Sequence, residues 1–177
     1  NGFKLSSASS YTNGGSMKYI YMAIRRPNKP ASEFEPEELF NTVQGESTIT
    51  TPSFNLGFSP DMAWEKAPSG GGDHYIGSRL QGAEHLLANE KNAAVPNTNI
   101  TWDYMNGWIE GFNGSNNYNS WGFKRAPGFF DTVCYEGNGQ ATHELPHNLG
   151  TYPEMAWVKA RDGAYPWPVY CKYTHPT

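Results

Sequence analysis

The chain has 177 residues and a net charge of −4, with few charged side chains (17%) and many aromatic ones (15%). This length allows one or two domains with a hydrophobic core, and the acidic balance argues against nucleic-acid binding, which needs a basic surface to neutralise phosphates. No apolar run is long enough to cross a bilayer and no signal peptide is evident, so we expect neither membrane insertion nor a nucleic-acid partner.

The first part of the chain predicts strands and loops. Residues 1–17 indicate a short strand and a loop, and residues 18–25 form an apolar run that indicates a strand covered on both faces. Residues 26–39 hold three prolines and an acidic run, which predict a connecting loop with one helical turn at 36–39. Residues 82–89 are the one further stretch compatible with a helix.

Short strands separated by turns make up the rest of the chain. Dipeptides such as Asn106-Gly107, Asn138-Gly139 and Asp162-Gly163 supply the positive φ that tight hairpins need. This pattern predicts an all-β fold of antiparallel, β-sandwich-like repeat modules with short strands and many turns. The strands expected in this region include 48–50, 62–66, 74–79, 85–88, 99–104 and 107–112.

The chain also repeats itself at a nearly constant spacing. Counterparts in the best-matching segments lie 93 residues apart (148 − 55 = 93; 153 − 60 = 93), which indicates two copies of one structural unit. We expect the copies to superpose, with Trp64 over Trp157 and both side chains mostly buried. The matching segments are 1–3 with 106–108, 19–27 with 118–127, 40–43 with 130–133, 55–57 with 148–150, and 60–67 with 153–160.

The repeat divides the chain into four parts. Residues 1–27 correspond to the C-terminal part of a preceding unit, 28–39 to a Pro-rich acidic linker, 40–127 to a complete β unit, and 128–177 to the first half of a following unit. This pattern, with no Met at the start, predicts a segment of a longer protein. Because a half-unit cannot bury its apolar face alone, we expect residues 1–27 to complete a sheet with strands of the 40–112 region.

The two cysteines, Cys134 and Cys171, are both replaced in the other unit, where Gln44 and Ser78 stand at the matching positions. Their joint loss is compatible with a disulfide and equally with two thiols at tolerant positions. Two cysteines do not imply a disulfide framework, so both alternatives stay open.

Three segments carry a resemblance to a known family: YIYMAIRRP at 19–27, APGFFDTVCYEGNG at 126–139 and HNLGTYPEMAWVK at 147–159. Their order resembles a module repeated in virion proteins of tailed phages. It is especially similar to modules in tail-fibre-like and other surface proteins of marine phages, often beside concanavalin/laminin-G-like domains. The first unit departs from this pattern, because Phe54 stands where the pattern has His147, so His147 is not required for the fold.

The resemblance implies a non-enzymatic structural component of a virion, located in a tail fibre or another surface appendage. It implies other virion proteins as partners, a homo-oligomer such as a trimer, and contact with host surface glycans. A carbohydrate-binding module of a secreted enzyme is the alternative, and the sequence of the full-length protein would discriminate between the two.

No catalytic or metal-binding motif stands out in the sequence. His143 and His147 lack partners at zinc-finger spacing, no calcium loop is present, and no hydrolase or phosphate-binding signature occurs. Carboxylates that could form a glycosidase pair are Asp103, Glu110, Asp131 and Glu154, but the separation of such groups cannot be read from a sequence. We therefore expect no catalytic residue, no metal and no cofactor.

Aromatic residues suggest a glycan contact. A sugar presents an apolar face that stacks on a Trp or Tyr ring, and the candidates for this contact are Trp102, Tyr104, Trp108 and Trp121. The alternative is that these rings fill a core that is poor in Leu and Ile, with each N–H or O–H bonded to a neighbour.

Overall fold

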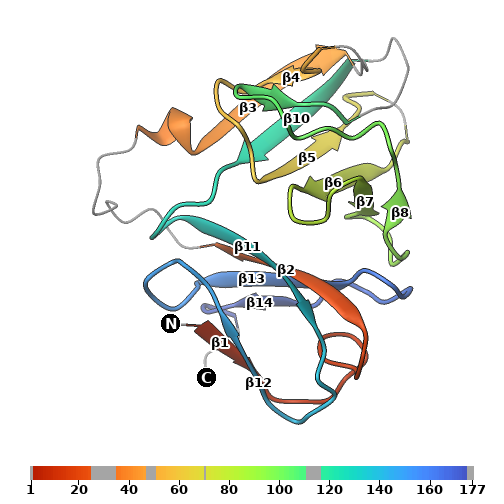
Figure 1. Ribbon diagram of the computed structural model, residues 1–177, viewed down its shortest axis with the longest axis vertical. Coiled ribbons are helices and arrows are strands. Elements are labelled where there is room, and N and C mark those ends of the chain that lie inside the picture. The colour runs from red at the N-terminus through yellow and green to blue at the C-terminus, as the bar shows by residue number, and fades with distance from the viewer. Residues whose placement is uncertain (1, 25–34, 47–50, 70, 111–116, 175–177) are drawn as a thin grey trace. The chain divides into compact units, whose positions relative to one another are not determined.

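The structure is a computed structural model that describes residues 2–24, 35–46, 51–69, 71–110 and 117–174. These residues form short antiparallel strands and one 3-10 turn, which confirms the predicted all-β, sandwich-like class (Figure 1). They divide into two compact units. Unit 1 comprises Asn1–Glu33, Lys91–Ala93 and Arg125–Thr177, and unit 2 comprises Phe34–Glu90 and Ala94–Lys124.

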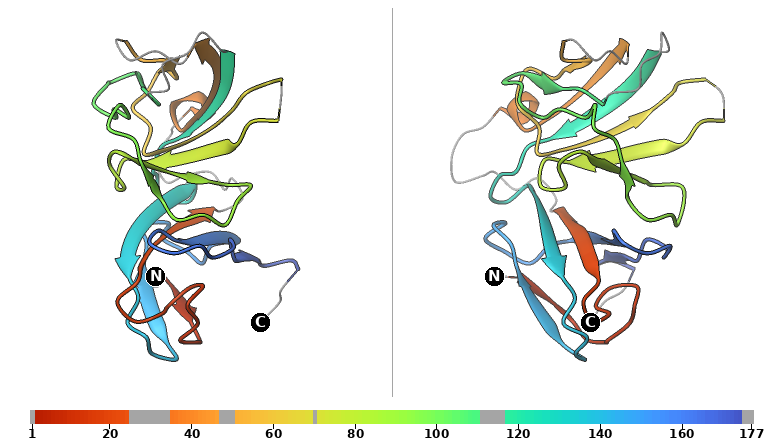
Figure 2. Two further views of the ribbon diagram at one scale, coloured as in Figure 1. Left: turned by 90° about the vertical axis from the view of Figure 1, so that its right-hand side faces the viewer. Right: turned by 45° about the vertical axis from the view of Figure 1, so that its right-hand side comes forward.

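Unit 2 is built on a six-stranded antiparallel sheet in the order β3-β10-β5-β6-β7-β8, and β4 and β9 form a separate pair (Figure 2). The 3-10 turn η1 (Pro36–Glu38) precedes β3. Phe54, Leu56, Trp102 and Trp108 are among the residues that form the core of this unit. The strands are β3 (Phe40–Glu46), β4 (Phe54–Asn55), β5 (Met62–Lys66), β6 (His74–Ser78), β7 (Glu84–Leu87), β8 (Val95–Pro96), β9 (Gly107–Trp108) and β10 (Asn117–Phe123).

Unit 1 has a four-stranded antiparallel sheet in the order β11-β2-β13-β14 and a separate β1-β12 pair. Its core includes Tyr19 and Tyr21 of the central strand β2, packed with Leu145, Leu149 and Val158. The strands are β1 (Gly2–Leu5), β2 (Lys18–Ile24), β11 (Phe130–Glu136), β12 (His143–Pro146), β13 (Met155–Ala160) and β14 (Val169–Cys171).

The two units use one pairing scheme, so the sequence repeat is also a repeat of structure. In each unit a central strand, β10 or β2, lies between a strand that begins with Phe and a strand that carries Met-x-Trp. The registers agree as well: Met62 pairs with Ser78 in unit 2, and Met155 pairs with Cys171 in unit 1, 93 residues further on at both partners (155 − 62 = 93; 171 − 78 = 93). The β4-β9 and β12-β1 pairs join similar parts of the two units but in different registers, because the counterpart of Phe54 is His147, whereas Leu145 is the partner of Phe3.

The expectation that residues 1–27 complete a sheet with strands of the 40–112 region is wrong. Strand β2 pairs with β11 and β13 instead, so the described parts of 1–27 and 128–177 form one unit together. The physical reason is that β10 already occupies the central position between β3 and β5. The two flanking segments then provide the missing strands for each other.

A turn with the sequence Asn-Leu-Gly, in which only the leucine is buried, explains two of the repeated motifs. In unit 1 the carboxylate of Asp131, at the start of β11, accepts hydrogen bonds from Thr132 N (3.0 Å) and Asn148 N (2.7 Å). In unit 2 the matching Asn41 accepts a hydrogen bond at Oδ1 from Thr42 N. Its Nδ2 donates a second hydrogen bond to Leu56 O at 2.9 Å. The glycines that end these turns have φ values of +85° (Gly57) and +73° (Gly150), which other residues adopt only with strain.

Most of the expected elements that lie within the described residues form. Strand β2 is buried along both faces, as its apolar run predicts, and η1 lies at the predicted turn. Strand β7 (Glu84–Leu87) confirms the expected strand 85–88 and excludes the helical alternative for 82–89, whereas residues 99–104 contribute only an isolated bridge between Thr101 and Ile109. Strand β3, in contrast, was missed by the sequence pattern. The expected strand 48–50 and the end of the expected strand 107–112 lie outside the described residues.

Cys134 and Cys171 are not joined by a disulfide. They lie on β11 and β14, the two outer strands of the sheet of unit 1, with β2 and β13 between them. Three strand spacings of about 4.8 Å separate them by roughly 14 Å. A disulfide needs Cα atoms within about 4.4–6.8 Å, so the sheet itself keeps these thiols apart.

We expect Asp131→Ala to destabilise unit 1 by about 2–4 kcal/mol, because it leaves two backbone N–H groups without their charged acceptor. Urea denaturation followed by intrinsic fluorescence measures this change. Asp103→Ala is the matched control, since the Asp103 side chain is 92% exposed and its loss should change stability by less than about 0.5 kcal/mol. Equal stability of the two variants would contradict the structural role of Asp131.

Candidate functional site

Trp102 and Trp108, two of the predicted glycan contacts, belong to the core of unit 2. Their relative exposures are 5% and 1%, and their rings stack on each other with centroids 4.9 Å apart and an interplanar angle of 11°. Trp108 Nε1 donates to Ser120 Oγ (3.1 Å) and Trp102 Nε1 donates to Gly82 O (3.2 Å). Both rings are covered on their faces, so the prediction that they stack on a sugar is wrong and the core interpretation holds for them.

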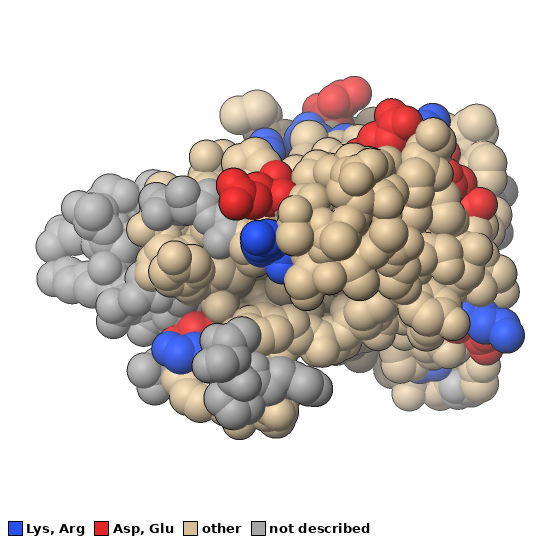
Figure 3. Space-filling model, turned by 90° about the horizontal axis from the view of Figure 1, so that it is seen from below, with Lys and Arg blue, Asp and Glu red and all other residues tan. Residues whose placement is uncertain are grey.

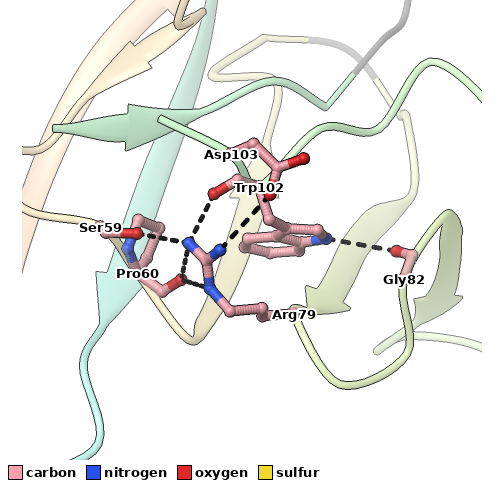
Figure 4. Close-up of polar contacts among 6 residues, drawn as sticks. All are labelled: Ser59, Pro60, Arg79, Gly82, Trp102 and Asp103. Atoms are coloured by element: carbon pink, nitrogen blue, oxygen red, sulfur yellow. Dashed lines mark hydrogen bonds and ion pairs between the residues drawn. The ribbon is translucent and has the colours of Figure 1, made fainter. Parts of the chain in front are cut away.

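An arginine holds the segment that carries Trp102 (Figure 4). Arg79 Nη2 donates to Trp102 O at 2.5 Å and to Ser59 Oγ, and Arg79 Nε donates to Pro60 O at 3.3 Å. Asp103 Oδ1 lies 3.9 Å from Arg79 Nη1, but its exposed carboxylate adds little to this arrangement. The guanidinium therefore connects two loops that lie 42 residues apart in the sequence (102 − 60 = 42).

A hollow of about 280 Å³ on the sheet of unit 2 is the best candidate for a binding site. Trp121, the third predicted contact, lines it from β10, and Trp64 and Lys66 line it from β5. Phe40 of β3, Phe123 of β10 and His74 of β6 complete the lining. Five of these side chains are half-buried and Phe40 is 37% exposed, so the rings offer part of their surface to a ligand.

Strand register places these six side chains on one face of the sheet. Side chains directly opposite each other in an antiparallel pair point the same way, and the pairs are Trp121 with Trp64, Phe123 with Phe40, and Lys66 with His74. The Phe40 and Phe123 rings lie 4.9 Å apart and the Trp64 and Trp121 rings 6.3 Å apart, tilted by 50° and 59°. Because these rings are tilted and do not stack on each other, part of each ring face borders the hollow.

The hollow is a feature of unit 2, because the matching residues of unit 1 differ. Met22 and Ile24 stand at the positions of Trp121 and Phe123, as the pairing of the central strands shows. The Trp-x-Lys pair of β5 recurs as Trp157 and Lys159, but Lys159 is fully buried. Burial lowers the pKa of Lys159 to about 8. Trp64 and Trp157 are both half-buried and do not belong to the core of their units. The Met-x-Trp motif therefore marks the same position in both units, but its tryptophan is not a core side chain.

A pair of buried carboxyl groups lies on the other side of the sheet. Glu65 and Glu110 are 0% and 1% exposed, and Glu65 points away from Trp64 and Lys66 because side chains alternate along β5. Burial, reinforced by the neighbouring Glu110, raises the pKa of Glu65 well above its usual range, so this group holds a proton at neutral pH. Unit 1 has Val158 and Leu5 at the matching positions (158 − 65 = 93; 110 − 5 = 105), which shows that the fold itself needs no acid here.

The remaining residues named in the sequence analysis either support the fold or lie at the surface outside the hollow. Tyr104 is half-buried and does not line the hollow. Asp131 caps the Asn-Leu-Gly turn, and the exposed Asp103 lies near Arg79. His147 Nδ1 accepts a hydrogen bond from Leu149 N at 3.3 Å, and burial lowers the pKa of its ring. Among the described residues, no group of three His, Cys, Asp or Glu side chains is placed to hold a metal ion.

Comparison of the chain with protein-family models, curated proteins and solved structures finds no match. Within the part of the chain that the structure describes, no helix combines the length and the apolar character needed to cross a membrane.

We expect Glu65→Val to stabilise unit 2 at pH 8 and to flatten its pH dependence. In the folded protein Glu65 stays protonated above pH 4.5, the ordinary pKa of a glutamate side chain. In the unfolded chain the same carboxyl group loses its proton above that pH. The wild-type protein should therefore lose roughly 1.4 kcal/mol of stability per pH unit from this group as the pH rises from about 5 to 8. Valine at this position, as in Val158, should remove that loss.

Urea denaturation of both proteins at pH 5 and pH 8 measures the effect. Glu90→Val, which changes an exposed residue of the same unit, is the control and should keep the wild-type pH dependence. If Glu65→Val shows the same slope with pH as the wild type, Glu65 is not protonated in the folded protein.

Proposed function

We propose that the chain is a non-enzymatic structural component of a phage virion, in a tail fibre or another surface appendage, and that the hollow of unit 2 binds host-surface saccharides. The placement in a virion is supported by the sequence resemblance in segments 19–27, 126–139 and 147–159. The binding activity is supported by one structural observation: four aromatic side chains converge on one open hollow at the surface of unit 2.

The lining of the hollow suits binding and not turnover. Saccharide rings have apolar C–H faces that pack on aromatic rings, and Lys and His side chains supply donors for hydroxyl or acidic groups. Glycoside hydrolysis requires two carboxyl groups on either side of the bond that is cleaved. The six lining residues include no carboxylate, and the acidic pair of unit 2 lies on the opposite side of the sheet.

A weak site of this size becomes useful when it is presented many times. At about 280 Å³ the hollow lies near the lower limit of ligand sites, so a single copy should bind weakly. Cyclic oligomers such as trimers present several copies together, and linked sites convert later binding events into intramolecular ones. A broad area at the centre and right of the face drawn in Figure 3 carries neither acidic nor basic side chains, and both kinds lie around it, which suits contact with other virion proteins.

A carbohydrate-binding module of a secreted enzyme is the second candidate, and the same aromatic hollow favours it. The two candidates differ in where the protein is found. Labelling intact phage particles with an antibody against this chain, followed by electron microscopy, should show it on a tail or surface appendage. A soluble protein joined to a catalytic domain would favour the second candidate and contradict the virion proposal.

We expect Trp121→Ala and Trp64→Ala to weaken saccharide binding and host-cell adsorption about tenfold each. An aromatic contact of this kind contributes roughly 0.5–1.5 kcal/mol beyond its burial, and 1.4 kcal/mol corresponds to a factor of ten. A glycan array and a cell-adsorption assay measure the effect. Tyr152→Ala is the matched control, because this ring is 81% exposed, belongs to unit 1 and does not line the hollow.

Circular dichroism of each variant should show an unchanged fold, since neither Trp64 nor Trp121 belongs to the core of unit 2. Adsorption that is lost equally in Tyr152→Ala, or retained in both tryptophan variants, would place binding elsewhere on the protein. Saccharide cleavage by the wild-type protein would contradict its non-enzymatic role.

A further inference from the structure

We infer that the hollow of unit 2 selects saccharides that carry a carboxylate, such as oligouronates, over their neutral counterparts. This inference rests on the proposed saccharide binding and adds the chemical class of the ligand. It follows from the charges that line the hollow, from the hydrogen-bonding state of Lys66, and from a comparison with the matching lysine of unit 1.

The basic groups of the hollow lie together on one side of it. Lys66 and His74 are direct cross-strand partners on β5 and β6, so their Cβ atoms are about 4.5–5.5 Å apart. Both line the hollow next to Trp64, whose ring centroid lies 6.2 Å from that of His74. A sugar ring that packs on Trp64 and Trp121 therefore meets these two basic side chains at its edge.

No acidic residue lines the hollow beside these two basic side chains. Glu65 precedes Lys66 by one position along β5 and so points to the other face. Asp73 lies just before β6, does not line the hollow, and interacts electrostatically with Tyr75 and His85. Asp73 Oδ1 accepts a hydrogen bond from Asn89 Nδ2 at 3.0 Å. The chain as a whole is acidic, but salt screens charges beyond about 8 Å, so a ligand in the hollow responds mainly to Lys66 and His74.

The ammonium of Lys66 keeps hydrogen-bonding capacity for a ligand. A lysine ammonium has three N–H donors, and among the described residues Lys66 Nζ donates only to Gly72 O. In unit 1 the matching Lys159 Nζ donates to the carbonyls of Lys91, Ala160 and Gly163 at 3.1, 3.1 and 3.4 Å and is fully buried. The same position in the repeat thus holds a satisfied lysine in unit 1 and a half-exposed lysine with spare donors in unit 2.

A carboxylate is the group that these features fit best. Charge-assisted hydrogen bonds from an ammonium to a carboxylate are roughly twice as strong as those between neutral groups. A uronic acid carries its carboxylate at the edge of a ring whose C–H face can pack on tryptophan. It can therefore use the aromatic rings and the basic pair of the hollow at once, whereas a neutral sugar uses only the rings and weaker hydrogen bonds.

The test titrates the complete chain with trimers of galacturonate, glucuronate and mannuronate and with their methyl esters, and follows binding by calorimetry or tryptophan fluorescence. We expect at least one acid trimer to bind about tenfold more tightly than its ester. Lys66→Gln should remove this preference, because it weakens binding of the acid about tenfold more than binding of the ester, and Trp121→Ala should weaken binding of both. Lys4→Gln, which removes the same charge from an exposed position in unit 1, is the control and should keep the preference.

The outcomes separate this inference from the proposed function. Equal, Trp121-dependent binding of acids and esters overturns the selectivity for carboxylates and leaves saccharide binding in place. If the acids are preferred but Lys66→Gln keeps the preference, the assignment to this hollow is overturned. If no acid or ester trimer binds, or if an oligoglutamate peptide binds to the hollow more tightly than every trimer, both the inference and the proposed saccharide binding fail.

Discussion

The structure depends on one constraint: each sheet has a central strand whose two neighbours come from other parts of the chain. In unit 2, β10 joins β3 and β5, and in unit 1, β2 joins β11 and β13, with nearly all of unit 2 in the sequence between them. Both faces of β2 are buried, so this strand cannot be stable until its distant partners arrive. Formation of unit 1 therefore requires closure of a loop of about 100 residues between β2 and β11 (130 − 24 = 106), and unit 2 closes one of about 70 residues between β3 and β10 (117 − 46 = 71). Because the closure entropy grows only slowly with loop length, both units bear a similar cost.

The repeated motifs maintain this pairing, while the residues between them are free to differ. Asp131 and Asn41 connect the first strand of each unit to the Asn-Leu-Gly turn, and the buried leucine of that turn packs in the core. Only these few positions need particular side chains to fix the register. The outward residues of β5 and β10 carry no such requirement, which allows unit 2 to place aromatic rings there and unit 1 to place Met22 and Ile24.

Sequence reasoning recovered the fold class and the repeat register, because Gly turns and the Met-x-Trp spacing are local signals. It failed on the partner of β2, since two copies of one unit present similar strand edges and no local pattern states which copy a strand joins. It also misplaced Trp102 and Trp108. Alternating aromatic residues identify a face but not what covers it, and the cover of Trp102 depends on Arg79, 23 residues away. Trp121 lines the hollow, and its contact with a sugar stays a prediction, while the other lining residues come together only when strands far apart in sequence are paired.

The differences between the two units favour function over stability as the reason for the polar residues in unit 2. Unit 1 fills the positions of Glu65 and Glu110 with Val158 and Leu5, and it satisfies Lys159 with backbone carbonyls. A buried acid pair destabilises a fold that an apolar pair would stabilise, and exposed aromatic rings gain nothing from the core. These features coincide on the two sides of one strand, β5, where Trp64 and Lys66 face the hollow and Glu65 faces the core. Unit 2 thus differs from unit 1 on both faces of β5, and the proposed binding of a ligand in the hollow would explain the difference on the face that carries Trp64 and Lys66.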